Sequence, residues 1–309
     1  MNKYFWTNRE IEIIKNTDLT LSEMMELLPN RSYSGIRGQI KKQGLSLSKE
    51  SISKAHTLAQ LGIKELDIDK ILLNIVFIDI VNGNLLGDAW ISKFHTFGLA
   101  SINRDFVEHI NFELNNIFKT NSKIGIKKKS KSIIYGKKFS RKKQYSTYKS
   151  CKPIFKLFYN KWYNNKKIIP DDLELTPRGC YYWYVGDGCL NCNPKKSVIS
   201  ISLATNGFSK TDVEKLICKL NCKIEGLNAS IQERKNHKRE KSFIIYIGSS
   251  SVLKFLDYVG EPFLKSFSYK WDIQGYSEIK TICKCCNREF IHYGFNKEYR
   301  VKCSECRKK

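Results

Sequence analysis

Apolar and polar positions in the first 45 residues follow the spacing of short helices. In "YFWTNREIEIIKNTDLTLSEMMELLPNRSYSGIRGQIKKQGL", Trp6, Ile11 and Ile14 lie on one helical stripe. Thr20, followed three residues later by Glu23, is a capping-box pattern that opens a second helix, which a proline then ends. The pattern therefore predicts three consecutive short helices in this region.

The third of these helices combines an apolar face with a basic one. Ile36 and Ile40 are spaced to face inward, whereas Tyr33, Arg37 and Lys41 recur at every fourth position and share the outward face. A basic third helix is typical of a helix-turn-helix unit, whose last helix enters the major groove of DNA. We therefore expect a DNA-binding helix-turn-helix domain at residues 1–47, with a small helical interaction bundle as the alternative.

The pattern between about residues 70 and 275 occurs twice. After a partly helical linker at 48–69, an apolar helix is followed by two strands, an amphipathic helix, two more strands and a closing helix. The same order, αββαββα, begins again after residue 169, and the acids that end the two apolar helices are 187 − 88 = 99 residues apart. Repeats at 70–169 and 170–275 predict an α+β fold with pseudo-twofold symmetry, whose strands form one continuous curved antiparallel surface.

The net charge of the chain indicates which kind of partner it binds. Its 309 residues hold 54 Lys and Arg against 30 Asp and Glu, a formal net charge of +24. Sixteen of the basic residues and no acidic one lie between residues 123 and 167, where they alternate with aromatic and β-branched residues. This pattern indicates a folded basic surface that binds nucleic acid rather than a membrane, and a solvated tail is the alternative. The longest apolar run, "ILLNIVFIDIV", is too short to cross a bilayer and contains Asp79.

Each apolar helix of the repeat ends in one acid beside a small residue. "VNGNLLGDA" carries Asp88 before Ala89, and "CYYWYVGDG" carries Asp187 before Gly188. An acid is unfavourable at the negative end of a helix dipole, so its presence at matched places in both repeats favours a functional role over a solvent-facing helix end. Two carboxylates, together with phosphate oxygens and water, form a ligand set that suits Mg²⁺.

These two segments resemble the paired motif of the LAGLIDADG homing endonucleases in their single-chain, two-repeat form. "KKIIPDDLELTPRGCYYWYVGDG" and "EPFLKSFSYKW" are similar to the family's run into the second helix and to its repeat-closing segment. The resemblance covers roughly 200 residues in the middle of the chain and implies a LAGLIDADG saddle with its two helices side by side. Gly83, Gly87 and Gly186 would permit their close approach, and Asp88 and Asp187 would bind the catalytic Mg²⁺.

The resemblance also implies further catalytic residues. Lys167 and Lys270 would each lie near a scissile phosphate and stabilise developing charge, and Asn206 would orient solvent. The alternative for the lysines is that they are ordinary surface residues that contact phosphates. The first repeat departs from the family pattern through Ala89 and through Asn84 inside the helix, which leaves the strand geometry after the first acid open.

Strand side chains that project into the major groove would read the DNA sequence, because Arg and Gln make bidentate contacts with guanine and adenine there. The predicted readers are basic or amide residues on the expected strands: Lys127, Lys129, Lys131, Arg141, Lys143, Gln232, Arg234, Lys238 and Lys241. The N-terminal helices in turn resemble the Myb/SANT-like helix-turn-helix domains of phage and mobile-element nucleases.

Four cysteines near the C-terminus have the spacing of a zinc ribbon. Cys283-x2-Cys286 and Cys303-x2-Cys306 are separated by sixteen residues and supply four thiolates for a tetrahedral Zn²⁺ site. The segment 276–309 is too short to bury a core of its own, so we expect the metal to fold it. Cys285 remains open as a replacement for one of the ligands.

A second, weaker group of cysteines lies within the second repeat. We expect these residues to be free thiols of a hairpin and a helix face rather than a second zinc site, because the chain lacks a secretory signal and its thiols stay reduced unless they bind metal. The group consists of Cys189, Cys192, Cys218 and Cys222.

Together the patterns predict a site-specific endonuclease that cuts both strands of DNA by Mg²⁺-dependent hydrolysis and, as the resemblance implies, leaves short 3′ overhangs. The alternative is a LAGLIDADG-derived nucleic-acid binder that does not cut, either an RNA-splicing maturase or a transcriptional regulator. An intein is disfavoured because the chain starts at Met and has no terminal His-Asn pair. We expect a monomer that binds double-stranded DNA and, as a maturase, intron RNA. Since no signal peptide pattern is present, we expect it in the cytoplasm or nucleoid of a bacterium or phage-infected cell, with an organelle matrix as the other location.

Overall fold

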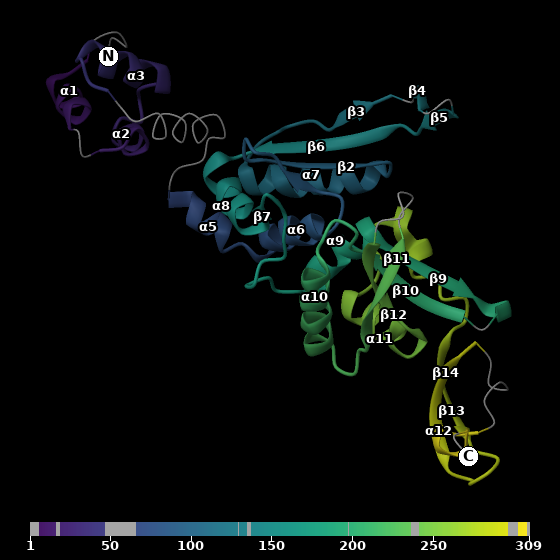
Figure 1. Cartoon of the computed structure of the whole chain (residues 1–309). Helices are drawn as coiled ribbons and strands as arrows, with labels where there is room; N and C mark the ends of the chain where they lie inside the picture. Colours follow the sequence, from purple (N-terminus) through teal and green to yellow (C-terminus); the bar gives the residue numbers. More distant parts are fainter. Residues whose placement is uncertain are drawn as a thin grey trace. The chain divides into compact units, whose positions relative to one another are not determined.

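The computed structural model of the chain describes residues 6–16, 19–46, 66–128, 130–134, 137–196, 198–235, 241–295 and 302–307. Its elements follow the predicted order of three helices, two mixed α/β copies and a C-terminal hairpin (Figure 1). By contacts the chain divides into two compact units, one of residues 1–78 and 90–160 and the other of residues 79–89 and 161–309. The first copy therefore gives the acid-bearing end of its first helix to the second unit.

The N-terminal helices have a hydrophobic core of their own. Thr7 and Thr20 each form a complete capping box at the start of a helix, and the Ser32 hydroxyl accepts from Gly35 N at the start of the third. The buried core consists of Ile14, Leu21, Met24, Leu28, Ile36 and Ile40. The helices are α1 (Asn8–Lys15), α2 (Leu21–Leu27) and α3 (Tyr33–Lys42).

The face of α3 that was predicted to point outward is only partly exposed. Arg37 and Lys41 are exposed, whereas Tyr33 packs against the core of the three helices. Tyr33 is the first residue of α3, and its side chain is half-buried. The prediction that all three residues share an outward face was therefore wrong for Tyr33.

The first copy forms a four-stranded antiparallel sheet in the order β1-β2-β6-β3. Helix α7 packs against β2 and β6, and Phe155 of α8 stacks on Phe97 of β2 with ring centroids 5.8 Å apart. These helices cover one face of the sheet and leave the other exposed. The elements are α5 (Leu66–Leu72), α6 (Ile75–Leu86), β1 (Trp90–Ile91), β2 (Thr96–Ser101), α7 (Arg104–Phe118), β3 (Gly125–Lys127), β6 (Gln144–Ser150) and α8 (Lys152–Trp162).

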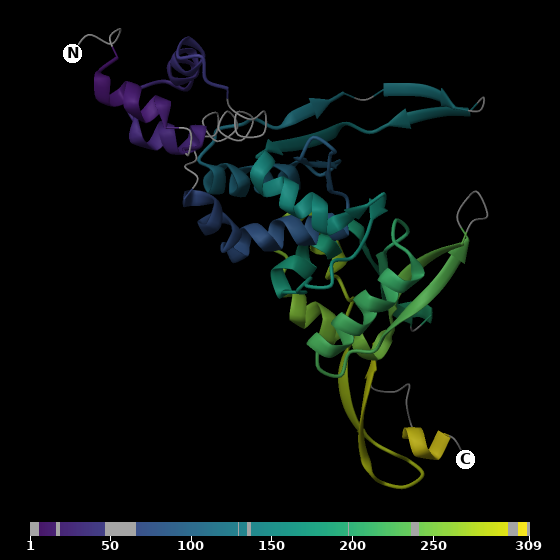
Figure 2. The same cartoon turned by 60° about the vertical axis from the view of Figure 1, so that its left-hand side comes forward.

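The basic strand pair of the first copy is longer than the sequence predicted. Beyond the pairing of Lys127 with Gln144, the chain continues into β4 (Ser130–Ile134) and β5 (Lys137–Arg141), with Ser130 opposite Arg141. Both views show this hairpin extending past the end of α7 (Figures 1 and 2). The segment between the two expected strands is thus itself a two-stranded ribbon, because its β-branched residues favour extended backbone.

The second copy repeats the arrangement with the sheet order β11-β12-β10-β9. Helix α10 packs against β11 and β12, and α11 packs against α9 and β10. The elements are β7 (Tyr163–Asn164), β8 (Lys166–Lys167), α9 (Pro177–Asp187), β9 (Gly188–Asn193), β10 (Val198–Ala204), α10 (Lys210–Lys223), β11 (Ala229–Lys235), β12 (Lys241–Ile247), α11 (Ser249–Val259) and the 3₁₀ helices η1 (Pro194–Lys196) and η2 (Lys265–Lys270).

The strands of the two copies form two separate four-stranded sheets among the described residues. Each sheet has the first strand of its copy, β1 or β9, at one edge. The expectation that the strands of both copies form one continuous antiparallel surface stays a prediction.

The C-terminal segment is a hairpin with a short helix. Strands β13 (Ser277–Ile282) and β14 (Glu289–Gly294) pair in antiparallel register and α12 (Ser304–Arg307) follows. The Tyr276 hydroxyl donates to Ser249 O (2.9 Å) and so connects the hairpin to α11. None of the helices in the described part of the chain has both the length and the apolar composition needed to cross a bilayer.

Candidate active site

The two apolar helices α6 and α9 cross at a pair of glycines. A Cβ atom on Gly83 would lie 2.3 Å from Gly179 O and 2.9 Å from Tyr182 Cβ, so only glycine fits at this position. A Cβ on Gly87 or Gly186 would make ordinary contacts of 3.7 Å or more. Of the three glycines predicted to allow close approach, Gly83 is therefore the one that the packing requires.

The crossing brings the ends of both helices together. Helix α6 ends at Leu86, two residues before Asp88, and Asp187 is the last residue of α9. A Cβ built on Gly87 would lie 3.8 Å from the carboxylate carbon of Asp187, and one on Gly186 would lie 3.8 Å from Asp88 N. The two acid-bearing turns are thus in contact, as the duplicated motif predicted.

The two carboxyl groups influence each other's protonation. Burial raises the pKa of Asp187 to about 6, and repulsion by Asp88 adds to this effect, while Lys167 and Lys270 oppose it. Burial also raises the pKa of Asp88, again against the attraction of the two lysines. Two acids that are costly to ionise together form a site that a bound cation would stabilise.

Each acid-bearing turn is held by one lysine. The buried Lys270 amine donates to Tyr184 O (3.0 Å), Val185 O (2.8 Å) and Gly188 O (2.7 Å) at the end of α9. Carbonyl oxygens at a helix C-terminus lack intrahelical partners and carry partial negative charge, so an ammonium group is favourable there.

The lysine of the first copy has the corresponding position. Lys167 donates to Ala89 O (3.0 Å) and Gly87 O (3.4 Å) on the turn that carries Asp88. Burial lowers the pKa of both lysines to about 8, with the nearby acids opposing the shift. The alternative that both are ordinary surface lysines is wrong for Lys270, which is only 5% exposed.

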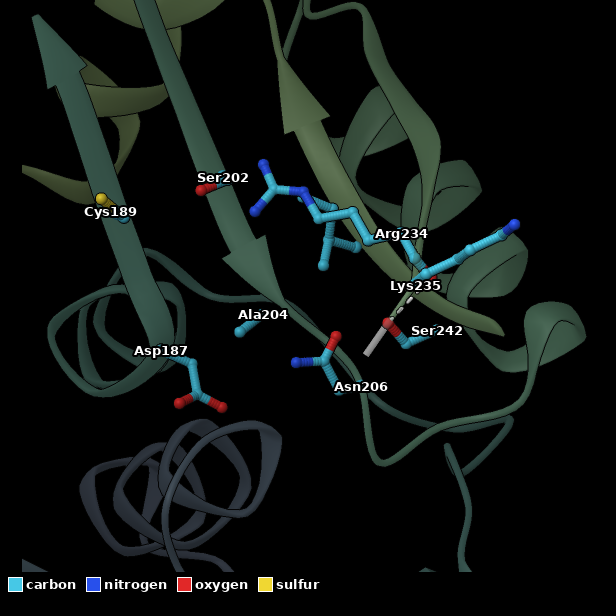
Figure 3. Close-up of a pocket in the computed structure, with 9 residues that line it drawn as sticks. Asp187, Cys189, Ser202, Ala204, Asn206, Arg234, Lys235 and Ser242 are labelled. Atoms are coloured by element: carbon cyan, nitrogen blue, oxygen red, sulfur yellow. Dashed lines mark hydrogen bonds between the residues drawn. The ribbon is translucent and has the colours of Figure 1, made fainter. Parts of the chain in front are cut away.

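The exposed face of the second sheet forms an open pocket beside Asp187. Asn206, in the turn after β10, lines this pocket together with Arg234 of β11 and the Asp187 side chain (Figure 3). The pocket has a volume of about 360 Å³. Asn206 thus lines the same pocket as Asp187, and its predicted role in orienting solvent stays a prediction.

A third acid at the helix crossing was missed as a site residue. Asp79 of α6 is buried and accepts a hydrogen bond from the Thr176 hydroxyl (2.6 Å), which in turn accepts from Gly179 N at the start of α9. Burial raises the pKa of Asp79, and the bond from Thr176 opposes this. The sequence does carry a signal for this residue, since an acid inside an apolar helix requires a partner.

The departures of the first copy from the repeat pattern have local explanations. In the second copy a Cβ atom on Gly188 would lie 2.0 Å from the Tyr184 ring. The first copy has Leu85 in place of this tyrosine, and the corresponding position holds the buried Ala89. Asn84 bonds back to Ile80 O through its side-chain amide (2.7 Å) and so remains inside its helix.

Comparison with known proteins now identifies the family. Residues 78–255, more than half of the chain, match the LAGLIDADG DNA endonuclease family. The chain belongs to this family. It is 38% identical over 123 residues to the probable intron-encoded endonuclease 1 of Wickerhamomyces canadensis, a match that covers 38% of this chain and about half (51%) of that protein. Its fold is similar to a structure of the homing endonuclease I-WcaI bound to its DNA recognition sequence, with a TM-score of 0.51 and 27% identity over 81% of this chain and 96% of the other.

The predicted DNA readers of this LAGLIDADG chain fall on different faces. Gln232 and Arg234 lie on the exposed face of the second sheet, and Lys127 lies opposite Gln144 on that of the first. Lys241 forms a salt bridge with Glu233 on the opposite face from Arg234, since alternate strand residues point to opposite sides. This placement of Lys241 differs from its predicted role as a DNA-reading residue on the exposed face. Of the other readers, Lys143 is exposed, Lys131 and Arg141 lie on β4 and β5, and Lys129 and Lys238 lie outside the described residues.

The four predicted zinc ligands come together outside the region that matches the LAGLIDADG family. The sulfur atoms of Cys283, Cys286, Cys303 and Cys306 all lie within 4.8 Å of one another. Those of Cys286 and Cys303 are 3.7 Å apart, close to the roughly 3.8 Å expected of a tetrahedral site with metal–sulfur bonds of about 2.3 Å. The backbone N–H of Cys303 donates to Cys283 Sγ and lowers the pKa of that thiol to about 6, which favours the ligating thiolate.

The remaining cysteines of interest do not join this group. Cys285 is exposed and is not one of the four. Among the described residues no second cluster of metal-binding side chains includes Cys189, Cys192, Cys218 or Cys222, and the expectation of free thiols at these positions stays a prediction.

Proposed function

We propose that this chain is a site-specific homing endonuclease that hydrolyses both strands of a DNA target with a divalent metal and leaves short 3′ overhangs. The observation that carries the proposal is the contact between two acid-bearing helix ends from a duplicated fold. Family membership and the likeness to a DNA-bound homing endonuclease support it. Both acids come from one chain, which supports a monomer as the active form.

Asp88 and Asp187 are proposed as the ligands of Mg²⁺. Their oxygen donors match the preference of a hard cation, and burial together with repulsion by Asp88 raises the pKa of Asp187 in spite of the two nearby lysines, which makes a bound cation favourable there. Such a cation, when bound, lowers the pKa of an attacking water and stabilises the negative charge of the transition state.

The other site residues are proposed to organise this centre. Lys167 and Lys270 hold the turns that carry the acids through the backbone carbonyls described above, and their positive charges lie in the electrostatic field of both carboxylates. Asn206 offers an amide to solvent or phosphate in the pocket beside Asp187. Catalysis by these residues would come from positioning and charge stabilisation.

The flanking segments are proposed to extend the DNA contact. The three N-terminal helices (1–47) would act as a helix-turn-helix domain through the exposed Arg37 and Lys41. The C-terminal segment (276–309) would bind Zn²⁺ through its four clustered thiolates and present basic residues to the phosphates. The linker at 48–69 and the central domain at 70–275 complete the proposed organisation.

The test is a cleavage assay on a plasmid library with randomised target sites, with and without Mg²⁺. We expect linear products with the wild type and none with Asp187→Asn or Asp88→Asn. The matched control is Asp171→Asn, which removes an exposed acid of the same unit that pairs with Lys215. Tight binding without nicking by the wild type would contradict the proposal and favour a maturase or regulator.

A further inference from the structure

An aromatic pair occupies the exposed face of the first sheet, beginning two residues after Asp88. Trp90 of β1 lies opposite Gly98 of β2, which lies opposite Tyr148 of β6. The Trp90 and Tyr148 rings meet edge to face, with centroids 6.1 Å apart and planes at 72°. Their exposed fractions are 37% and 53%, so this apolar surface is available to a partner.

The glycine between the two aromatic residues is required by this arrangement. A Cβ atom on Gly98 would lie 2.7 Å from two carbons of the Trp90 indole. The indole therefore lies directly over the backbone of β2, in space that any other residue would fill. The absence of a side chain on β2 thus leaves room for the indole, and we call the Trp90–Tyr148 pair the aromatic platform.

The second copy has a different surface at the corresponding row. Two residues after Asp187, Cys189 lies opposite Ser202, and Ser202 lies opposite Tyr246. Tryptophan over glycine in one copy thus corresponds to cysteine beside serine in the other. Cys189 and Ser202 line the open pocket beside Asp187 (Figure 3). Tyr246 stands where the first copy has Tyr148, so the second copy keeps the tyrosine but has no tryptophan beside it.

We infer that Trp90 and Tyr148 read 5-methyl groups of pyrimidines, principally thymine, in the half-site bound by the first copy. The inference rests on the proposed function, which places both exposed sheet faces against DNA. The thymine C5-methyl group is the apolar group that standard base pairs present in the major groove, and apolar side chains recognise it by contact. The second copy lacks the platform and would not share this preference.

The position of the platform along the chain restricts the bases that it can reach. Two residues of extended chain span at most about 7 Å, and one base-pair step rises about 3.4 Å per strand. The Trp90 backbone is therefore within about two base-pair steps of the Asp88 backbone. The preferred thymine should lie close to the cleaved bonds and not at the outer end of the half-site.

The first experiment compares binding preferences selected from a random-sequence duplex pool. We expect the wild type to prefer thymine near the centre of one half-site, and Trp90→Cys to lose that preference in this half-site alone. Cys189→Trp combined with Ser202→Gly should introduce a thymine preference in the other half-site. Preferences that are unchanged in Trp90→Cys, or that weaken equally in both half-sites, would overturn the inference.

A second experiment removes only the methyl group. Deoxyuridine in place of the preferred thymine should weaken wild-type binding by about fourfold, the value of one buried methyl group, and 5-methylcytosine should bind better than cytosine there. Neither change should affect Trp90→Cys. Equal binding of thymine and deoxyuridine duplexes by the wild type would contradict the inference even where cleavage itself is intact, which separates its failure from failure of the proposed function.

Two further variants test whether a loss of discrimination occurs without misfolding of the protein. Tyr148→Ser replaces an exposed ring, and Gly98→Ala keeps the indole but displaces it. Both should lose the discrimination between thymine and deoxyuridine while their thermal melting remains cooperative. Retention of full discrimination by Gly98→Ala would show that the position of the indole is irrelevant and would count against the platform.

Discussion

The amines of the buried lysine side chains are stabilised in two different ways. Lys167 and Lys270 bind carbonyl oxygens and lie near two carboxylates. Lys149 of β6 is also buried, but within the described part of the chain its amine donates to neutral groups, namely Asn115, Thr120 and Ser122. Burial lowers the pKa of Lys149 to about 8. No acidic group counteracts this effect of burial on Lys149, unlike on Lys167 and Lys270, among the described residues.

The first prediction concerns this lysine and pH. Because its pKa is near 8 in the folded chain and about 10.4 when unfolded, the unfolded state binds more protons between these values. The free energy of unfolding should therefore rise with pH from about 8 to 10.4. Lys149→Met should make this rise less steep, because Lys167 and Lys270, whose pKa is also about 8, keep their share of it, and should stabilise the protein at pH 7 by roughly 1–3 kcal/mol, measured by urea denaturation. Lys128→Met, at an exposed position, is the control, and a rise in Lys149→Met as steep as that of the wild type would contradict the assignment.

The second prediction concerns the helix crossing. Gly83→Ala should destabilise the protein by about 3 kcal/mol, because the new methyl group would meet the Gly179 carbonyl at 2.3 Å. Gly207→Ala, at a position with no atom within 4 Å of the new methyl group, should change the denaturation midpoint little. Equal effects of the two substitutions would show that the crossing is looser than its geometry indicates.

At the scale of elements, the end of α9 depends on a segment far away in the sequence. The 3₁₀ helix η2 brings Lys270 to the carbonyls of α9, and the Tyr184 hydroxyl returns a hydrogen bond to Lys270 O (2.6 Å). The end of α9 and Lys270 therefore stabilise each other's position. The acid at position 187 is positioned by this contact as well as by its own helix.

The third prediction follows from this contact. Lys270→Met should destabilise the protein by about 2–3 kcal/mol, because buried carbonyl groups lose a charged donor, and should lower kcat for DNA cleavage. Lys265→Met replaces an exposed lysine of the same 3₁₀ helix and is the control for both measurements. Full stability with abolished cleavage would instead indicate a purely catalytic lysine.

At the scale of the whole molecule, the described chain combines modules with separate sources of stability. The N-terminal helices have their own apolar core, whereas the C-terminal hairpin gathers four thiols. The mixed α/β copies lie between them in the sequence. Loss of one flanking module should therefore leave the others folded.

The fourth prediction separates the C-terminal module from the rest. Removal of metal by a chelator, or Cys303→Ser, should increase amide hydrogen exchange in β13 and β14, while the buried helices α6 and α9 stay protected. Cys285→Ser, at the exposed cysteine outside the cluster, should retain about one zinc per chain by elemental analysis. Unchanged exchange after metal removal would contradict a structural metal.

The fifth prediction concerns electrostatic binding to DNA. With a formal net charge of +24, the affinity for a duplex should fall steeply with salt. The double substitution Arg37→Ala and Lys41→Ala should reduce the slope of log K against log salt by about 1–2, the value of one or two phosphate contacts. Arg104→Ala, at a residue paired with Glu108 on α7, is the control. An unchanged slope in the double variant would argue against DNA contact by α3.

The sequence by itself determined the features that depend on local spacing. The helix caps, the order αββαββα, the two matched acids and the cysteine pairs are all relations between residues near each other in the chain, or between copies of one pattern. Hydrophobic periodicity and hydrogen-bonding side chains at fixed offsets express such relations directly. For this reason the pairing of Thr20 with Glu23, and of Cys283 with Cys286, follows from their spacing alone.

Only the tertiary structure decided which distant groups meet. It showed that Gly83 is sterically required while Gly87 and Gly186 are not, and that Lys270 is buried against the end of α9. It also showed that Tyr33 packs against the helical core and that Lys241 pairs with Glu233. The physical reason is that steric space, desolvation and strand register arise from atoms brought together by folding. Spacing along the chain does not encode them.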